Sequence, residues 1–515
     1  MTLPFSRREF LKQLAVAGSA GLASVQGSQS PRPFSFTAPE TLPVLLAAQK
    51  GRRLSYIGSA TSHFQAEPLL YDTQGSPLVL SDWEYEVTRR LKGQPSGIPH
   101  ADVTNLPRFL ANKTQYLHRS AALSENMFRF SLDFGRLCPK AGEFNYPLMA
   151  EYMRALALIK AQGQEPFLTL HHFTMPRYLI KTDRNGSITA GGWEHPDVIR
   201  HFRFFISNVV AFLYQEPRIR PILEQLQLGR EIQDRILHEG LVRYVMTINE
   251  PAVTLFNGYL GGTMPPYKRT GVFALRRVLS RLVEAHDLAL NELKQASVTR
   301  QAPAQVCIGH NWQYFDGIIG RLADEFQREW TASFERDGQH SDFLSLHYYF
   351  RQTIPLGSRE QRQRDYGDQP SFGDIYPQGI LKVLELMHSS YPSKQILIGE
   401  IGFSDQHDRR RPYWILETIR YIIDAVGHGL PVRGVLLWSL VNNFEWEFGM
   451  SQKFGLFGEA ELSSLPVQST NGIKSWEAWQ AVTKAILAPS PERLKELQRT
   501  YELAYKQYKG AGGHF

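Results

Sequence analysis

The chain contains 515 residues, of which 43% are hydrophobic and 21% are charged, as is ordinary for a globular protein with a large core. The formal net charge is +7, but the lysines and arginines are spread along the chain, which argues against a nucleic-acid-binding surface. Only two cysteines are present, Cys138 and Cys307, too few for a disulfide framework or a cysteine-ligated metal cluster.

The N-terminal segment Ser6–Lys12 reads SRREFLK, and a short stretch rich in Ala and Gly, Leu14–Val25, follows it. This order is typical of a twin-arginine export signal, with a basic amphipathic helix as the alternative. We therefore expect residues 1–35 to be signal and linker, and the protein to be periplasmic or extracellular in a bacterium. No clear Ala-x-Ala site follows, which leaves cleavage open. No later stretch is apolar enough for a membrane span, so none is expected in the mature chain.

Eight short apolar runs along the chain are candidates for buried parallel strands. They are Leu54–Ala60, Met127–Leu132, Pro166–His171, Tyr244–Asn249, Gln305–His310, Asp342–His347, Gln395–Glu400 and Arg433–Trp438. Amphipathic segments such as Tyr146–Gln162, Leu275–Gln295 and Trp414–Gly427 lie between them. Because eight βα units close most simply into a barrel, we expect an α/β fold over residues 36–488, a (β/α)8 TIM barrel with elaborated βα loops.

Three segments interrupt this repeat. Asp72–Asn105 and Arg351–Tyr376 contain Gly and Pro and are expected to form long loops on the active face. The charged segment Glu216–Gly240 is compatible with helix. The sequence leaves open whether it is a lid, a contact surface or an addition without a specific role.

Residues 489–515 are predicted to form a C-terminal amphipathic helix, because Ser490 and Pro491 form a typical helix start. Its apolar face would consist of Leu494, Leu497, Tyr501, Ala504 or Tyr505, and Tyr508. We expect this face to dock on the barrel, with binding of a partner as the alternative.

Two of the apolar runs lead into a glutamate: Glu250 in TINEP (247–251) and Glu400 in IGEIG (398–402). A glutamate at the end of a buried strand is costly to desolvate without a partner or a purpose. Cleavage of an acetal needs two carboxyl groups, one to protonate the departing oxygen and one to attack the anomeric carbon or activate water. Glu250 and Glu400 are therefore candidates for a catalytic pair across the barrel mouth.

Several segments resemble glycoside hydrolase family 1, over about residues 54–487. TINEP resembles the TxNEP signature that carries the family's acid/base, and Glu400 matches its nucleophile. Other matching segments follow in order: Tyr56–Glu67, Phe128–Ser131, Leu168–Pro176, Gly258–Pro266, Asp342–Tyr349, Ile375–Gly379 and Trp438–Phe457. The resemblance implies a retaining β-glycosidase that works by double displacement through a glycosyl-enzyme ester, with no cofactor and no metal.

The resemblance also implies roles for residues around the two glutamates. Arg129 and Tyr349 would support the nucleophile and keep its pKa low. Asn249 would bind the sugar 2-hydroxyl, and Glu445 would accept hydrogen bonds from the 4- and 6-hydroxyls and repel a 6-phosphate. An unphosphorylated β-D-glucoside or β-D-galactoside is therefore the expected substrate. The implied sugar-binding residues are Gln65, His172, Asn249, Trp438, Glu445, Trp446 and Phe454.

The sequence departs from the family pattern beside the site. Gly399 and Ile401 replace Thr and Asn around the nucleophile, His347 stands where Asn commonly precedes two tyrosines, and Phe173-Thr174 replaces Trp-Asp. The segments RRRPY (409–413) and YPQGILKVLELM (376–387) are similar to the branch that contains galactolipid-remodelling galactosyltransferases. A transglycosidase with a sugar or glycolipid acceptor is therefore the alternative within enzymes.

Two further alternatives belong to other classes. A catalytically inactive sugar-binding barrel usually lacks one of the two glutamates, and both are present here. A metal-dependent hydrolase would need a His/Asp cluster at strand ends, but the adjacent pair His171-His172 points to opposite faces of a strand. The glycone, the aglycone, the linkage and the oligomeric state are not readable from the sequence.

Overall fold

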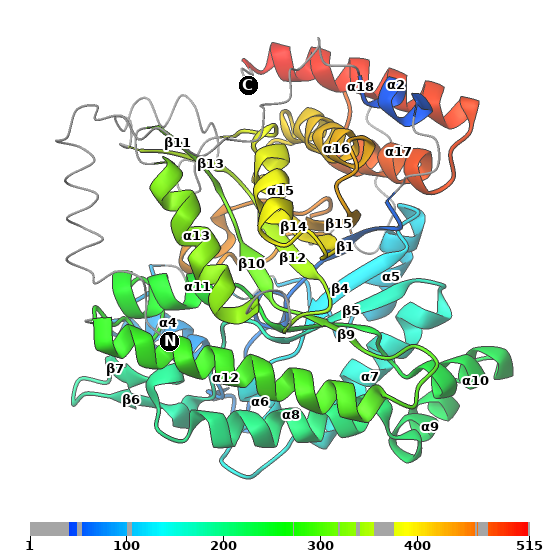
Figure 1. The fold of residues 1–515 in the computed structure, drawn as a ribbon. Helices are drawn as coiled ribbons and strands as arrows, with labels where there is room; N and C mark the ends of the chain where they lie inside the picture. Colours follow the sequence, from blue (N-terminus) through cyan, green and yellow to red (C-terminus); the bar gives the residue numbers. More distant parts are fainter. Residues whose placement is uncertain are drawn as a thin grey trace.

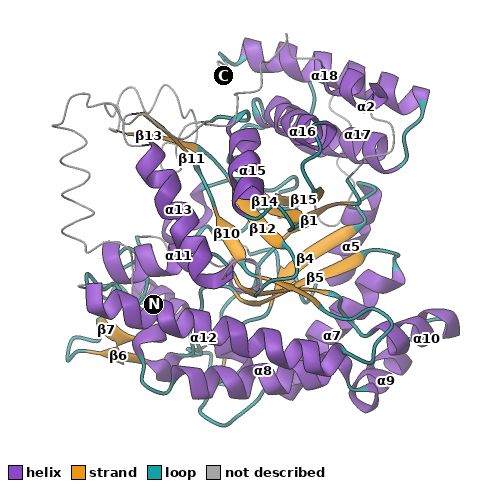
Figure 2. Ribbon diagram, viewed as in Figure 1, coloured by secondary structure: helices purple, strands orange, loops and turns teal. Residues whose placement is uncertain are grey.

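The computed structural model describes residues 41–48, 54–99, 103, 106–270, 272–317, 320–335, 340–354, 375–458, 461 and 472–512. A parallel sheet occupies the centre and helices cover it (Figures 1 and 2). The twin-arginine segment and most of Arg351–Tyr376 lie outside the described residues. Within them, no helix combines the length and the apolar character that crossing a membrane requires.

The central sheet is a (β/α)8 barrel, as the eight apolar runs predicted. Its strands are β1 (Tyr56–Ala60), β4 (Met127–Ser131), β5 (Glu165–His171), β8 (Tyr244–Ile248), β9 (Gln305–Cys307), β10 (Gly309–Asn311), β12 (Leu344–Tyr348), β14 (Ile396–Ile401) and β15 (Val432–Trp438). They are parallel and follow the order β10-β12-β14-β15-β1-β4-β5-β8-β9. Only Ile308 separates β9 from β10. The fifth predicted run therefore supplies both the first and the last strand of the sheet, and this brings the sheet close to closure.

Apolar side chains fill the barrel below its mouth. The inward-facing cluster comprises Met127, Phe167, Tyr244, Met246, Cys307, Phe343, Leu397 and Leu436. Met127, Phe167, Tyr244 and Leu397 lie in the first half of their strands, whereas Glu400 and Trp438 lie at or near the ends of theirs. Both cysteines are free and buried, as expected of thiols without a redox partner.

Amphipathic helices surround the barrel. The longer ones are α7 (Tyr146–Ala161), α8 (Val198–Tyr214), α12 (Val272–Ser297), α13 (Gly320–Glu335), α15 (Gly379–Ser390), α16 (Arg411–Gly427) and α17 (Ser475–Leu487). In α8 the buried residues Val198, Phe202, Phe205, Val209 and Leu213 recur every three or four positions, so one face packs inward. The three helices expected from sequence periodicity are thereby confirmed as α7, α12 and α16.

The charged segment before β8 forms two short helices, α9 (Glu216–Gln225) and α10 (Arg230–Glu239). They join the end of α8 to the beginning of β8, and Figure 1 shows them beside α7 at the edge of the molecule. Lys160 of α7 forms an ion pair with Glu239 at 2.6 Å, and its carbonyl oxygen accepts a hydrogen bond from Arg235. This segment therefore lies at the end of the barrel where strands begin, so it is not a lid over the mouth.

The segment Asp72–Asn105 was expected to be a long loop, and that expectation was wrong in part. It contains part of a small antiparallel hairpin, β2 (Leu70–Tyr71) with β3 (Pro77–Leu78), and the helix α4 (Asp82–Leu91). The α4 helix begins with a capping box in which Ser81 and Glu84 satisfy each other's backbone N–H groups. Since it follows β1, α4 lies on the mouth side of the barrel.

The chain ends in α18 (Pro491–Gly510), whose first turn is capped by the Ser490 hydroxyl. Leu497, Ala504 and Tyr508 are buried, whereas Tyr505 is exposed. The α18 helix packs on α16 and α17, and α2 (Leu42–Ala48) lies against α16 and α18 (Figure 1). The predicted apolar face thus docks on the protein's own barrel.

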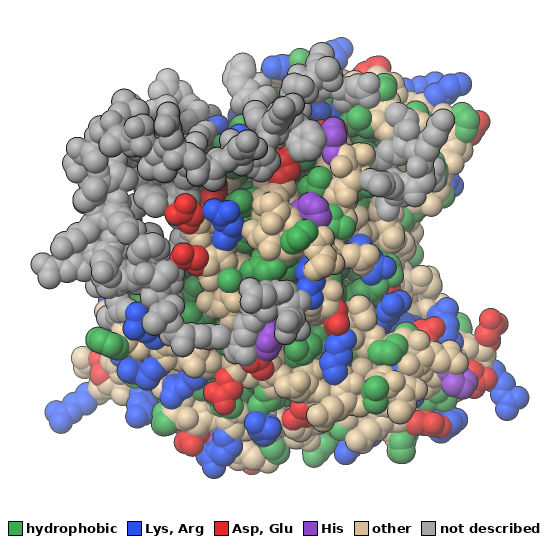
Figure 3. Space-filling view, viewed as in Figure 1, with side chains coloured by type: hydrophobic (Ala, Val, Ile, Leu, Met, Phe, Trp, Pro, Cys, Tyr) green, Lys and Arg blue, Asp and Glu red, His purple; other side chains and the backbone are tan. Residues whose placement is uncertain are grey.

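Charged side chains of both signs are interspersed over the surface seen in Figure 3. Lys and Arg do not gather into one continuous patch on this face.

Candidate active site at the barrel mouth

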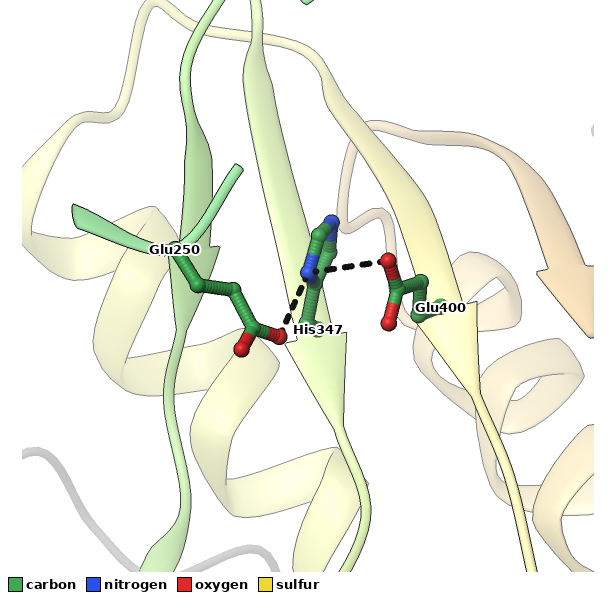
Figure 4. Close-up of side chains that lie close together, drawn as sticks. All are labelled: Glu250, His347 and Glu400. Atoms are coloured by element: carbon green, nitrogen blue, oxygen red, sulfur yellow. Dashed lines mark hydrogen bonds and ion pairs between the residues drawn. The ribbon is translucent and has the colours of Figure 1, made fainter. Parts of the chain in front are cut away.

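The two glutamates singled out in the sequence meet at the mouth of the barrel (Figure 4). Glu250 follows β8, has a left-handed backbone conformation (φ 41°) and precedes the short helix α11 (Pro251–Val253). Glu400 lies near the end of β14. Both are buried, with 7% and 3% of their surfaces exposed, and their facing carboxylate oxygens lie within 4.8 Å of each other.

Glu400 is held as an anion by its neighbours. Arg129 Nη1 donates to Glu400 Oε1 at 2.5 Å, and the Tyr349 hydroxyl donates to Oε2 at 2.5 Å. Burial by itself would raise the pKa of Glu400. Coulombic interactions with His347 and Arg129 outweigh burial and lower the pKa of Glu400, with His172 and the Tyr349 hydrogen bond adding to the effect.

Arg129 also organises the side chains around Glu400. Its Nε donates to Thr169 Oγ1 at 2.9 Å, and its Nη2 donates to Asn249 Oδ1 at 2.6 Å. The Asn249 amide nitrogen in turn lies 3.2 Å from His172 Nε2. One buried guanidinium on β4 therefore connects the nucleophile candidate to Asn249 and, through it, to His172, two of the residues expected to bind the sugar.

A second polar group lies farther around the mouth, at Glu445. Gln65 Nε2 donates to Glu445 Oε2 at 3.1 Å, and Trp438 Nε1 donates to Oε1 at 2.8 Å. Burial raises the pKa of Glu445 to about 8. The two hydrogen bonds oppose that rise, and the nearby charge of Glu400 adds to it. Trp438 of β15, Gln65 of α3 (His63–Ala66) and Glu445, which follows β15, thus form one polar group.

Aromatic rings make up one wall of the site. Trp446 is nearly parallel to the ring of His172, with centroids 5.8 Å apart, and stacks on Phe64 at 5.5 Å. The ring centroid of Trp83 on α4 lies 4.7 Å from that of Trp446. Sequence reasoning missed Trp83, because its segment was expected to be a loop and nothing local to the residue indicates its contact with Trp446.

Phe454 lies against Tyr349, the residue whose hydroxyl donates to Glu400. Its ring is perpendicular to that of Tyr349, with centroids 5.9 Å apart, and both residues belong to a small buried cluster with Ala60 and Trp438. Every side chain that the sequence implicated in catalysis or sugar binding therefore lies at this mouth.

His347 lies between the two glutamates, and sequence reasoning gave it no role in the site. Its Nδ1 lies 2.8 Å from Glu250 Oε1 and 3.5 Å from Glu400 Oε1, and its ring is fully buried. The sequence marks His347 as a departure from the family pattern. Its place between the two glutamates depends on how β8, β12 and β14 are arranged, which no local signal conveys.

Glu250, His347 and Glu400 are also the one group of potential metal ligands found among the described residues. Their ligand atoms lie within 4.8 Å of one another. Arg129 already occupies Glu400 Oε1, so a divalent cation would have to compete with a buried guanidinium.

The profile of glycosyl hydrolase family 1 matches residues 56–216 and 335–461. The chain belongs to this family. The matched residues include β1, β4, β5, β12, β14 and β15, with Glu400 and Glu445. Residues 217–334 are not matched, and Glu250 is among them, so its assignment to the site comes from the TINEP segment and from the geometry above.

Individual family 1 members show low identity over long alignments. "Beta-glucosidase A" of Thermotoga maritima is 22% identical over 440 residues, which cover 75% of this chain and 89% of that protein. "Galactolipid galactosyltransferase SFR2, chloroplastic" of Arabidopsis thaliana is 23% identical over 382 residues, 70% of this chain and 55% of that one. The solved structure of the beta-glycosidase from Pyrococcus horikoshii superposes with a TM-score of 0.62 at 21% identity, covering 87% of this chain and 97% of that one. The structural likeness shows the shared barrel fold.

Proposed function

We propose that the protein is a retaining β-glycosidase that hydrolyses an unphosphorylated β-D-glucoside or β-D-galactoside. The observation that carries the proposal is the approach of two buried carboxylates, Glu250 and Glu400, to within 4.8 Å at the barrel mouth. Carboxyl groups about 5–5.5 Å apart suit a covalent intermediate and retention, whereas about 6.5–9.5 Å suits a water between them and inversion. The short separation favours the retaining mechanism.

In the first step, Glu400 attacks the anomeric carbon while Glu250 donates its proton to the departing oxygen. Arg129 and Tyr349 keep Glu400 ionised, as a nucleophile requires. In the second step, Glu250 takes a proton from water, which attacks the anomeric carbon and releases Glu400. Two inversions at the same carbon give net retention.

The glycone would lie between the aromatic wall and the polar group at Glu445. The Glu445 carboxyl can receive the 4- and 6-hydroxyls, and Gln65 and Trp438 hold it in place. A phosphate on the 6-hydroxyl would be buried beside a carboxyl whose hydrogen-bond partners, Gln65 and Trp438, carry no positive charge, and burial of an unpaired anion is strongly unfavourable. An unphosphorylated sugar is therefore the proposed glycone.

A second candidate is transfer of the glycosyl group to a sugar or glycolipid acceptor. The similarity to the Arabidopsis galactolipid galactosyltransferase supports it. Both reactions share the same glycosyl-enzyme, and they differ in whether water or an acceptor hydroxyl attacks it. Product analysis with and without a galactolipid acceptor distinguishes them, because a transferase yields a lengthened glycolipid where a hydrolase yields free sugar.

The main test is a panel of aryl β-glycosides with the wild type, Glu400→Ala and Glu250→Ala. Glu400→Ala should abolish turnover. Glu250→Ala should still form the intermediate from substrates with good leaving groups, because these need little protonation. Added azide should then release a β-azide, which shows retention directly.

The matched control is Glu231→Ala, on the exposed face of α10 at the opposite end of the barrel, which should keep wild-type rates. Wild-type turnover by Glu400→Ala, or an α-configured first product by NMR from the wild type, would refute the mechanism.

A further inference from the structure

The imidazole of His347 lies between the two catalytic carboxyl candidates (Figure 4). Nδ1 is 2.8 Å from Glu250 Oε1 and 3.5 Å from Glu400 Oε1. The ring has no exposed surface, so both interactions are shielded from bulk water. Electrostatic interactions are much stronger in such an environment than at the surface.

Glycines on both neighbouring strands make room for this ring. A Cβ at Gly399 of β14 would lie 2.8 Å from His347 Nε2 and 2.4 Å from Ser345 Oγ. A Cβ at Gly309 of β10 would lie 3.0 Å from His347 Cε1. Gly399 and His347 are two departures from the family pattern, and the structure shows that they are physically linked: a side chain at position 399 would occupy the space of the imidazole.

The proposed reaction moves one negative charge across this ring. Before the first step, Glu400 is the anion and Glu250 carries the proton. The bond between Glu400 and the anomeric carbon then forms, the bond to the leaving oxygen breaks, and that oxygen takes the Glu250 proton. In the glycosyl-enzyme Glu400 is a neutral ester and Glu250 is the anion, so the charge has passed from one side of His347 to the other.

We propose that His347 is a positioning residue that interacts with the charged carboxylate in both states, attracting Glu400 before the ester forms and donating its Nδ1–H to Glu250 afterwards. The inference rests on the proposed retaining mechanism. Of the two glutamates, Arg129 and Tyr349 hydrogen-bond to Glu400 alone, and no described side chain other than His347 hydrogen-bonds to Glu250. Within the described part of the site, His347 therefore holds the acid/base alone.

Several charged or titratable groups face His347 from the strands around it. They are Glu250 after β8, Glu400 on β14 and His172 after β5. Arg129 on β4 and Tyr349 after β12 bind the neighbouring Glu400 carboxylate. Gly309 of β10, which lies against the ring, has no charge. Loss of the imidazole leaves Glu400 with the cation of Arg129 and the Tyr349 hydrogen bond, so the pKa of Glu400 should rise.

The first experiment compares kcat/KM against pH on an aryl β-glycoside for the wild type, His347→Asn and His347→Ala. The Asn amide can replace the Nδ1–H donor but not its charge, whereas Ala removes both. We expect the acidic limb of both variants to move to higher pH, by roughly one unit. At its optimum, His347→Ala should lose about 100-fold in kcat/KM, and His347→Asn should lose clearly less.

If His347 acted only through packing, its variants would have a lower kcat/KM at every pH and the limbs of the pH profile would not move. That result would overturn the inference. Equal losses for Asn and Ala would overturn it as well, because the donor would then contribute nothing.

The second experiment is a double-mutant cycle with Gly399→Ala, analysed by kcat/KM and by thermal unfolding. Gly399→Ala should reduce kcat/KM strongly in the wild type and much less in His347→Asn, because the smaller Asn leaves room for the added methyl group. The clash with Ser345 is present in both backgrounds and cancels in the cycle. Additive losses would show that the two positions are independent and would overturn the inference.

The two proposals fail in different ways. If the wild type turns over no aryl β-glycoside, the proposed function fails and the inference falls with it. If the wild type is a retaining glycosidase and the His347 variants keep its pH limbs, the inference alone fails.

Discussion

Arg129 Nη1 lies 2.5 Å from Glu400 Oε1, and the two side chains are 1% and 4% exposed. The same guanidinium also donates to Thr169 and Asn249. A buried ion pair of this kind offers little net stability over an apolar pair, but removal of one partner leaves an uncompensated charge in the core. Arg129 therefore matters both to the charge of Glu400 and to the integrity of the mouth.

Replacement of Arg129 by Met should destabilise the protein by about 3–5 kcal/mol, because Glu400 then loses a buried cationic partner. Arg129→Lys should cost less, since a lysine keeps the charge but cannot reach Thr169, Glu400 and Asn249 together. Urea unfolding monitored by tryptophan fluorescence measures both changes. An Arg129→Met protein as stable as the wild type would mean that the ion pair between Arg129 and Glu400 does not form in solution.

The stability of the protein should depend on pH through Glu445. Burial raises the pKa of Glu445 from about 4.5 to about 8. Between these values the unfolded chain has released the proton while the folded protein keeps it, so the contribution of Glu445 to stability falls as the pH rises through this window. A glutamine at this position cannot ionise. The unfolding free energy of Glu445→Gln should therefore increase relative to that of the wild type between about pH 5 and pH 8.5.

Chemical denaturation at several pH values tests this expectation. The exposed residue Glu231 supplies the control, and Glu231→Gln should follow the wild type at every pH. A constant difference between Glu445→Gln and the wild type across the window would contradict the raised pKa.

The C-terminal helix should contribute to the stability of the whole fold. Leu497 of α18 is fully buried against the core, whereas Leu503 on the same helix is 54% exposed. Leu497→Ala should cost about 2–5 kcal/mol, and Leu503→Ala should change stability by less than about 0.5 kcal/mol. Equal, small effects in thermal unfolding would show that α18 does not dock in solution.

We also propose that the N-terminal segment SRREFLK directs twin-arginine export. Replacement of Arg7 and Arg8 by Lys keeps the positive charge but removes the arginine pair. Export should then fall sharply, measured as the share of glycosidase activity outside the cytoplasm after cell fractionation. Replacement of Lys12 by Arg is the matched control and should leave export unchanged. Unaltered export of the double-Lys variant would rule out this route.

Part of the fold was predictable because its signals are local. Each of the eight apolar runs overlaps a strand, since parallel strands buried on both faces need continuous apolar sequence. The start of α18 was predictable from Ser490 and Pro491. The same kind of signal was present at Ser81 and Glu84, a capping box that predicts α4, but the Gly and Pro residues around it favoured a loop.

The amino-acid sequence by itself determined the barrel and the candidates Glu250 and Glu400. An apolar strand and a glutamate at its end are both recognised from residues that are consecutive in the chain. Only the tertiary structure decided what lies between those glutamates. His347 reaches both of them because β12 pairs with β10 and β14, and because Gly309 and Gly399 leave the space that its ring occupies. Such a relation joins residues up to 97 positions apart, and it exists only once the strands are in register.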